Sequence, residues 1–152
     1  MFPLFRSNQE IMNRAEKKRL VQIIKDVELK TSGEVRVYLE GTCPTDNPME
    51  RCLELFQHLD MHKTILNNAV LIYIATNDRK YAIFGDKGIY AKAGADYWQL
   101  KANVLVQHLR KAEYALGIEK CILEIGASLA QFYPPVIGNK NELPDDILFG
   151  KF

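Results

Sequence analysis

The sequence lacks any apolar run that is long enough to cross a membrane, and it has almost no excess of charge. Its longest uninterrupted apolar stretch, residues 69–76, falls far short of the roughly 20 residues that a membrane-spanning helix needs. The 20 lysines and arginines are balanced by 19 aspartates and glutamates, so the net charge is +1. We therefore expect no membrane anchor and no dedicated nucleic-acid surface.

Cysteine is also scarce, and the sequence starts without a targeting signal. Cys43, Cys52 and Cys121 are odd in number and form no C-x-x-C pair, which favours reduced thiols over a disulfide framework. The N-terminal residues 1–6 lack a basic stretch followed by an apolar core, as a signal peptide would have. These features predict a cytoplasmic protein.

Common phosphate-binding and zinc-binding motifs are absent as well. Residues 85–88, Gly-Asp-Lys-Gly, lack the spacing of a Walker loop, and no G-x-G-x-x-G follows an expected strand. Glu54, His58 and His62 recur every four residues and could face one metal ion, but they lack the H-E-x-x-H order of zinc proteases. A solvent-facing set of side chains is the alternative interpretation.

What the sequence does contain is a pattern of alternating strands and helices. The β-branched run of residues 69–76 predicts a strand buried on both faces, and residues 34–40 alternate with period two. A helix over residues 48–59, started by Asn47 and Pro48, connects these two strands and makes them parallel. Residues 81–84 follow a short turn and can only return antiparallel.

The remaining segments complete a single domain. Residues 7–10 have the form of a capping box and predict a first helix, while residues 97–111 and 114–132 predict two more. We expect a three-layer α/β/α sandwich, with a small mixed sheet covered by helices on both faces. The domain spans residues 1–152, with a core over residues 8–133 and a polar C-terminal tail over residues 134–152 that shows no periodicity.

The predicted strand directions bring three polar segments to one edge of the sheet. The starts of the first two strands and the end of the third share that edge. The segments are Thr31-Ser32-Gly33-Glu34, Asn67-Asn68 and Gly85-Asp86-Lys87-Gly88. Carboxylate and amide oxygens suit Ca²⁺ or Mg²⁺, and Asp96 could add a third carboxylate from the following loop. The same residues could instead serve only as a helix stop, a turn and a cap.

The order of these segments resembles the TPM-domain family over about residues 8–133. The resemblance is carried by the segments 31–35, 67–72, 78–80 and 85–89, in that order. The family includes thylakoid-lumen proteins with acid phosphatase activity that act in photosystem II repair, and small bacterial homologues. Here the chain shows no signal peptide and no trailing membrane helix, and Ala69 stands where a glycine is common.

The resemblance implies divalent cation binding and a possible phosphatase activity at the predicted edge. Glu34, Asp86 and Asp96 are then the expected metal ligands, and Ser32 and Asp86 the expected catalytic residues. The expected substrate-binding residues are Thr31, Gly33, Asn67, Asn68, Gly85 and Gly88. The expected ligand is a phosphorylated small molecule. The alternative is a module without catalysis, whose bound cation orders the loops for a partner protein.

Overall fold

The computed structural model describes residues 11–136 and 147–152 of the chain. The helices are α2 (Arg14–Glu28), α3 (Pro48–His58), η1, a short 3-10 helix (Met61–Lys63), α4 (Lys87–Ala93), α5 (Ala95–Arg110) and α6 (Tyr114–Phe132). The strands are β1 (Glu34–Glu40), β2 (Ala69–Ala75), β3 (Lys80–Gly85) and β4 (Ile147–Phe149).

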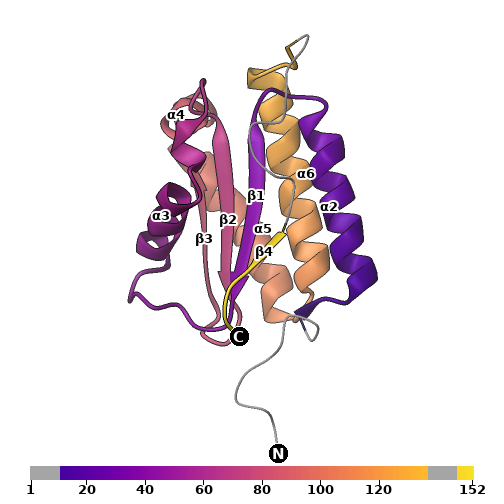
Figure 1. The fold of residues 1–152 in the computed structure, drawn as a ribbon, viewed down its shortest axis with the longest axis vertical. Coiled ribbons are helices and arrows are strands. Elements are labelled where there is room, and N and C mark those ends of the chain that lie inside the picture. The colour runs from indigo at the N-terminus through magenta and orange to yellow at the C-terminus, as the bar shows by residue number, and fades with distance from the viewer. Residues whose placement is uncertain (1–10, 137–146) are drawn as a thin grey trace, which may run out of the picture.

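The four strands form one mixed sheet in the order β3-β2-β1-β4 (Figure 1). β1 runs parallel to β2 and to β4, and β3 runs antiparallel to β2. Every residue of β2 is buried, which its uninterrupted apolar sequence predicted. The expected directions of the first three strands are therefore confirmed.

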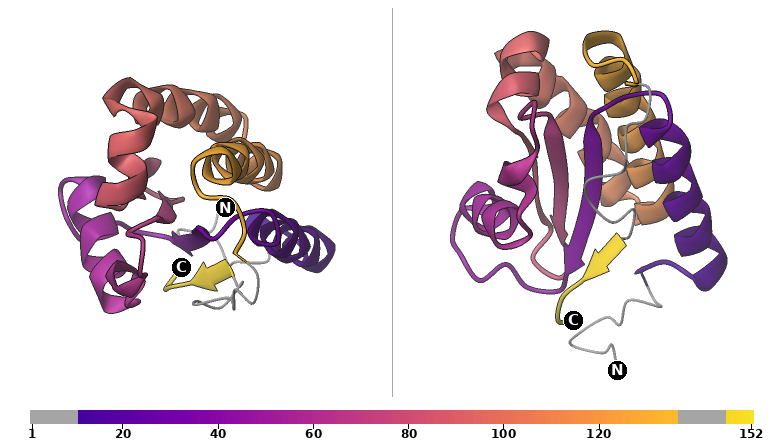
Figure 2. Two further views of the ribbon diagram at one scale, coloured as in Figure 1. Left: turned by 90° about the horizontal axis from the view of Figure 1, so that it is seen from above. Right: turned by 45° about the horizontal axis from the view of Figure 1, so that its top comes forward.

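Helices cover both faces of the sheet, which confirms the α/β/α sandwich. Alternate residues of β1 and β2, such as Val37 and Ile72, pack with the buried stripes of α2, α5 and α6. The residues between them, such as Leu71, pack with Cys52 and Phe56 of α3. Seen end-on, α3 stands on one side of the strands, and α5 and α6 stand on the other (Figure 2).

The helix starts follow local capping rules. The expected capping box of residues 7–10 lies outside the described residues. Helix α2 begins after a capping box made by Asn13 and Glu16. Asn47 caps α3 by accepting a hydrogen bond from the Met49 amide, and Pro48 occupies the first turn as expected. These caps fix where each helix meets the sheet.

The C-terminal segment contains a strand that its lack of periodicity did not predict. Ile147–Phe149 pairs with Val37, Tyr38 and Leu39, so β4 forms the edge of the sheet beside β1. The backbone amide of Gly150 then donates to the Leu39 carbonyl, and the Gly41 amide donates to the Lys151 carbonyl, each at 2.7 Å. Residues 147–152 thus pack at the end of β1 that lies away from the predicted polar edge.

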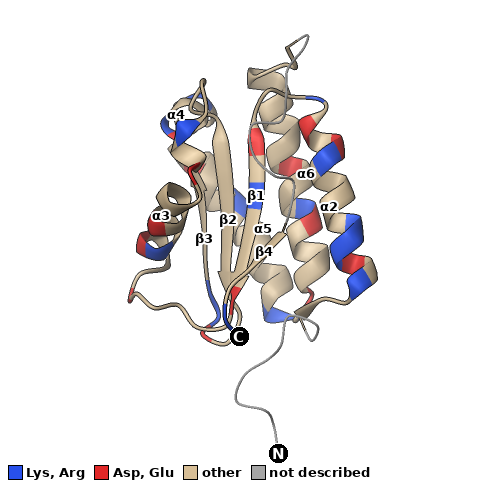
Figure 3. Ribbon diagram, in the orientation of Figure 1, with Lys and Arg blue, Asp and Glu red and all other residues tan. Residues whose placement is uncertain are grey.

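Charged residues lie mainly on the helices and at the strand ends, with Arg36 inside β1, and the central strand β2 carries none (Figure 3). Arg14 and Lys18 of α2 are exposed to solvent. Across residues 11–136 and 147–152, no helix combines the length and the apolar composition that a membrane span requires.

Candidate functional site

The three predicted segments meet at the edge of the sheet where β1 and β2 begin and β3 ends, at the top of Figure 1. Glu34 pairs with Ala69, and Val70 pairs with Gly85. Past the end of β3, the Asp86 amide donates to the Ala69 carbonyl at 2.9 Å. Glu34, Ala69 and Asp86 therefore form one row across three neighbouring chain segments.

The row places two buried carboxylates on either side of a small side chain. Glu34 is 2 % exposed, Asp86 is 9 % exposed, and Ala69 between them is fully buried. Two strand spacings separate the backbones of Glu34 and Asp86 by roughly 10 Å. Carboxylates at this separation can both reach one cation only when their side chains lean toward each other over Ala69.

Asp86 links this row to helix α4. Its Oδ1 accepts a hydrogen bond from the Lys87 amide at 2.8 Å, which makes Asp86 the N-cap of the helix. Its Oδ2 is buried and has no hydrogen-bond partner among residues 11–136 and 147–152. A buried carboxylate oxygen without a donor is costly, and a bound cation is one way to satisfy it.

The two asparagines hold the segments together mainly through their backbones. Asn67 adopts a left-handed conformation with φ of 53°, and its carbonyl accepts from the amides of Gly88 and Ile89 at 2.9 and 3.3 Å. Asn68 is almost fully buried, and its carbonyl accepts from the Glu34 amide at 3.3 Å. These bonds tie the loop before β2 to both neighbouring segments.

Thr31 and Ser32 are anchored to the end of α6. The Thr31 hydroxyl donates to the Tyr133 carbonyl and accepts from the Gly33 amide. The Ser32 amide donates to the same Tyr133 carbonyl at 3.0 Å, and its hydroxyl accepts from Asn68 Nδ2 at 3.5 Å. Asn68 is not a base, so the described surroundings of Ser32 do not activate it as a nucleophile.

The three glycines at the edge lie where a side chain would collide. A Cβ on Gly88 would approach the carbonyl oxygens of Leu66 and Asn67 to 2.5 and 2.6 Å. A Cβ on Gly85 would come within 2.3 Å of the Trp98 ring, and one on Gly33 would meet Leu129. Gly88 therefore allows the close approach of two loops, while Gly85 makes room for the indole.

Asp96 does not join the other two carboxylates. It lies in the first turn of α5 and is exposed. Within the described part of the chain, no three His, Cys, Asp or Glu side chains gather as a metal-ligating group. Glu54 and His58 of α3 and His62 of η1 therefore do not form such a group either. The edge thus offers two of the three predicted carboxylates.

Two residues at the edge were missed by the sequence analysis. The Tyr133 hydroxyl lies near Gly88, since a Cβ there would come within 2.8 Å of it. Burial and the nearby charge of Asp86 raise the pKa of Tyr133, so the phenol stays protonated. The Lys92 ammonium lies 4.2 Å from the centre of the Tyr133 ring. No local sequence pattern indicates that Tyr133 returns to residues 31 and 32, which are about a hundred positions away.

The fold and this edge define a class of α/β/α sandwich in which polar loops and two buried carboxylates share one end of a mixed sheet. The sequence model of the TPM domain matches residues 6–128 of the chain. The chain therefore belongs to the TPM-domain family.

Solved structures agree with this assignment. The BA42 protein of the psychrophilic bacterium Bizionia argentinensis is similar, with 36 % identity and a TM-score of 0.82 over 90 % of this chain and 93 % of that one. The N-terminal domain of cg2496 from Corynebacterium glutamicum shares the fold at 15 % identity, with a TM-score of 0.62 over 78 % and 74 % of the two chains. A comparison with curated proteins gives no match.

Proposed function

We propose that the edge binds a divalent cation, Mg²⁺ or Ca²⁺, and that the bound cation supports hydrolysis of a phosphomonoester. The observation that carries this proposal is the Asp86 carboxylate, whose Oδ2 is buried without a hydrogen-bond donor among the described residues. Family membership and the oxygen-rich loops are consistent with it.

The donor set fits a cation that keeps part of its own coordination shell. Glu34 and Asp86 would hold it, and Asp96 is left out because it does not cluster with them. Mg²⁺ is commonly bound through one or two carboxylates, with waters and substrate phosphates completing the shell. Two carboxylates therefore suit Mg²⁺ better than Ca²⁺, which takes more protein oxygens.

The chemistry of the proposed site divides between the cation and the side chains. The bound cation would neutralise phosphate charge and polarise water. The protonated Tyr133 hydroxyl and the Lys92 ammonium would supply donors for phosphate oxygens, and Asp86 would act through the cation that it holds. The main-chain bonds of Asn67 and Asn68 and the hydroxyl bonds of Thr31 keep these groups in place.

A non-catalytic role is the second candidate, and exposed apolar side chains favour it. Leu29 and Ile65 are 76 % and 83 % exposed, and they precede the Thr31 and Asn67 segments. Val136, which follows Tyr133, is 58 % exposed. A cation that orders these loops would present apolar contacts to a partner protein.

The first experiment measures the thermal midpoint of metal-stripped protein while Mg²⁺ or Ca²⁺ is added. A ligand that binds only the native state stabilises it by about 2.7 kcal/mol at a hundred times its Kd. Asp86→Asn should abolish the rise. Asparagine caps helices as well as aspartate does, so this variant removes the charge and keeps the cap. Asp96→Asn, which removes an exposed carboxylate, should keep the full response.

Turnover of p-nitrophenyl phosphate by the cation-loaded protein separates the two candidates. Turnover that requires Asp86 supports the hydrolase, and Ser32→Ala tests the serine as nucleophile. A cation response without turnover supports the interaction module. A flat midpoint with both ions would refute cation binding and both candidates with it.

A further inference from the structure

A second pocket lies at the other end of the sheet, where β2 ends and the chain turns into β3. It has a volume of about 530 Å³ and is enclosed by the end of β2, the β2–β3 turn and the junction of α5 and α6. This volume is within the usual range for small-molecule sites. In open α/β sheets, ligands commonly bind outside the carboxyl ends of the strands, and this pocket has that position.

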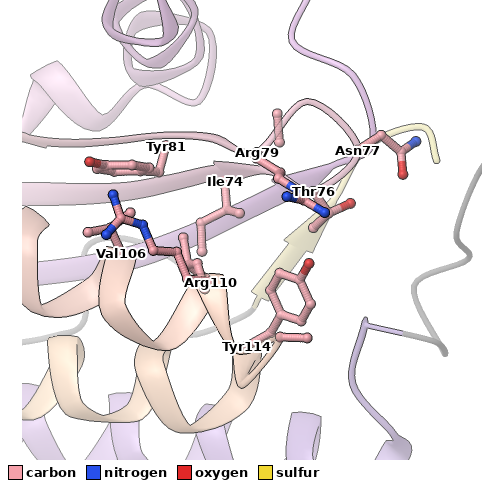
Figure 4. Close-up of a pocket in the computed structure, with 11 residues that line it drawn as sticks. Ile74, Thr76, Asn77, Arg79, Tyr81, Val106, Arg110 and Tyr114 are labelled. Atoms are coloured by element: carbon pink, nitrogen blue, oxygen red, sulfur yellow. The ribbon is translucent and has the colours of Figure 1, made fainter.

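Two arginines from separate elements line this pocket. Arg79 belongs to the β2–β3 turn, and Arg110 ends α5. Figure 4 shows Arg79 beside Thr76 and Arg110 extended toward Tyr81, with Ile74 between them. Arg79 has a positive φ of 54°, so the backbone that directs its side chain is in a conformation that is unfavourable for residues other than glycine.

Within residues 11–136 and 147–152, no acidic side chain forms an ion pair with either of these two cations. The described lining of the pocket contains no aspartate or glutamate. The nearest acids along the chain are engaged elsewhere. Asp78 Oδ2 accepts from the Cys43 amide at 2.7 Å, and Glu113 Oε1 lies 3.2 Å from His108 Nδ1.

Apart from Thr76 and Asn77, the rest of the lining is apolar or aromatic. Ile74 is almost fully buried, and Val106 and Leu109 of α5 extend the apolar wall. The Tyr81 ring lies opposite Arg110 in Figure 4. Arg110 also interacts favourably with the C-terminal end of the α5 dipole, but that role does not explain a second arginine across the same pocket.

We propose that this pocket binds a phosphorylated small molecule, whose phosphate is held by Arg79 and Arg110 once their exposed side chains turn toward each other across Ile74, and whose apolar part contacts Tyr81. The planar guanidinium group pairs with phosphate oxygens through two parallel hydrogen bonds, which a single lysine cannot do. The site is independent of the cation edge, because it lies at the opposite end of β2 and contains no metal-ligating side chain.

The test is a titration of the full-length protein with phenyl phosphate, followed by two-dimensional amide NMR in buffer that contains EDTA. The chelator removes any contribution of the cation edge, so the outcome does not depend on the proposed function. We expect saturable shifts at residues 74–81 and 109–114. Inorganic phosphate should shift the same amides at higher concentration, because it lacks the apolar part, and phenol should not.

Variants at exposed positions decide whether the arginines carry the binding. Arg79→Gln and Arg110→Gln should each weaken phenyl phosphate binding by roughly tenfold or more, since hydrogen bonds to charged groups are strong. Lys25→Gln is the matched control, because Lys25 is an exposed cation in the last turn of α2, which does not line the pocket. It removes the same charge and should bind as the unmodified protein does.

Three outcomes would overturn the proposal. One is an absence of saturable shifts at millimolar phenyl phosphate. Another is undiminished binding by the folded double variant Arg79→Gln/Arg110→Gln. The third is an equal loss in Lys25→Gln, which would reveal a response to net charge alone.

Discussion

Replacing Gly88 with alanine should destabilise the protein by forcing two loops apart. The new Cβ would lie 2.5 Å from the Leu66 carbonyl oxygen and 2.6 Å from that of Asn67. Both are backbone atoms, so neither can turn away as the end of a flexible side chain can. The Asn67 carbonyl also accepts the amides of Gly88 and Ile89, so moving it weakens both hydrogen bonds.

The size of the effect follows from three opposing contributions. Overpacking costs about 1–3 kcal/mol, and each weakened hydrogen bond costs about 0.5–1.5 kcal/mol. Because Gly88 lies in α4, alanine recovers up to about 1 kcal/mol of helix propensity. Overpacking and the two weakened hydrogen bonds together cost about 2–6 kcal/mol, so we expect a net loss of about 1–6 kcal/mol in the free energy of unfolding.

Urea unfolding followed by tryptophan fluorescence measures this loss. The single tryptophan, Trp98, is 7 % exposed and packs on Gly85, so its emission reports on the same end of the sheet. Lys87→Ala is the control, since Lys87 is exposed in the same helix and should change stability by less than about 0.5 kcal/mol. Equal stability of Gly88→Ala and the unmodified protein would refute the close-approach argument.

Three further predictions concern the core and the other end of the sheet. Arg51→Ala should lower the free energy of unfolding in urea by about 2–4 kcal/mol, because it removes the guanidinium that pairs with both oxygens of the buried Glu40 carboxylate. Arg19→Ala, which removes an exposed ion pair with Glu119, should change this free energy little. Burial raises the pKa of the Cys121 thiol to about 12, so the thiol of the unfolded chain loses its proton at a lower pH than the folded one. The free energy of unfolding should therefore fall as the pH rises above 9. In Cys121→Ala, the urea midpoint should fall less steeply with pH than in the unmodified protein. Ile147→Ala should cost about 2–4 kcal/mol if β4 packs as described, and a smaller loss by calorimetry would contradict that packing.

The central elements could be predicted because each has a strong local signal. β2 is apolar without interruption, α6 has a regular stripe that starts at Tyr114, and α3 begins with Asn47 and Pro48. The parallel order of β1 and β2 then follows from the right-handed crossover rule. β4 gave no such signal, because it is short, and pairing with β1 rather than its own periodicity makes it a strand.

The candidate edge could be predicted only where its residues adjoin strand ends. Strand directions bring Glu34 and Asp86 to the same edge, because Glu34 begins β1 and Asp86 directly follows the end of β3. Tyr133 reaches Thr31 through a contact 102 positions apart along the chain, at the end of a helix whose pattern indicates only burial. Arg79 and Arg110 line one pocket for the same reason, through the packing of α5 on β3.

The acidic edge and the arginine pocket should act independently, because they lie at opposite ends of β2. A strand of seven residues separates them by roughly 20 Å, well beyond the Debye length of about 8 Å at physiological ionic strength. Effects at such distant sites normally add within about 0.5 kcal/mol. Asp86→Asn should therefore leave the Kd of phenyl phosphate in EDTA unchanged within about twofold, as measured by the same amide NMR titration. A shift of fivefold or more would mean that β2 couples the two ends, and the two sites would then have to be treated as one.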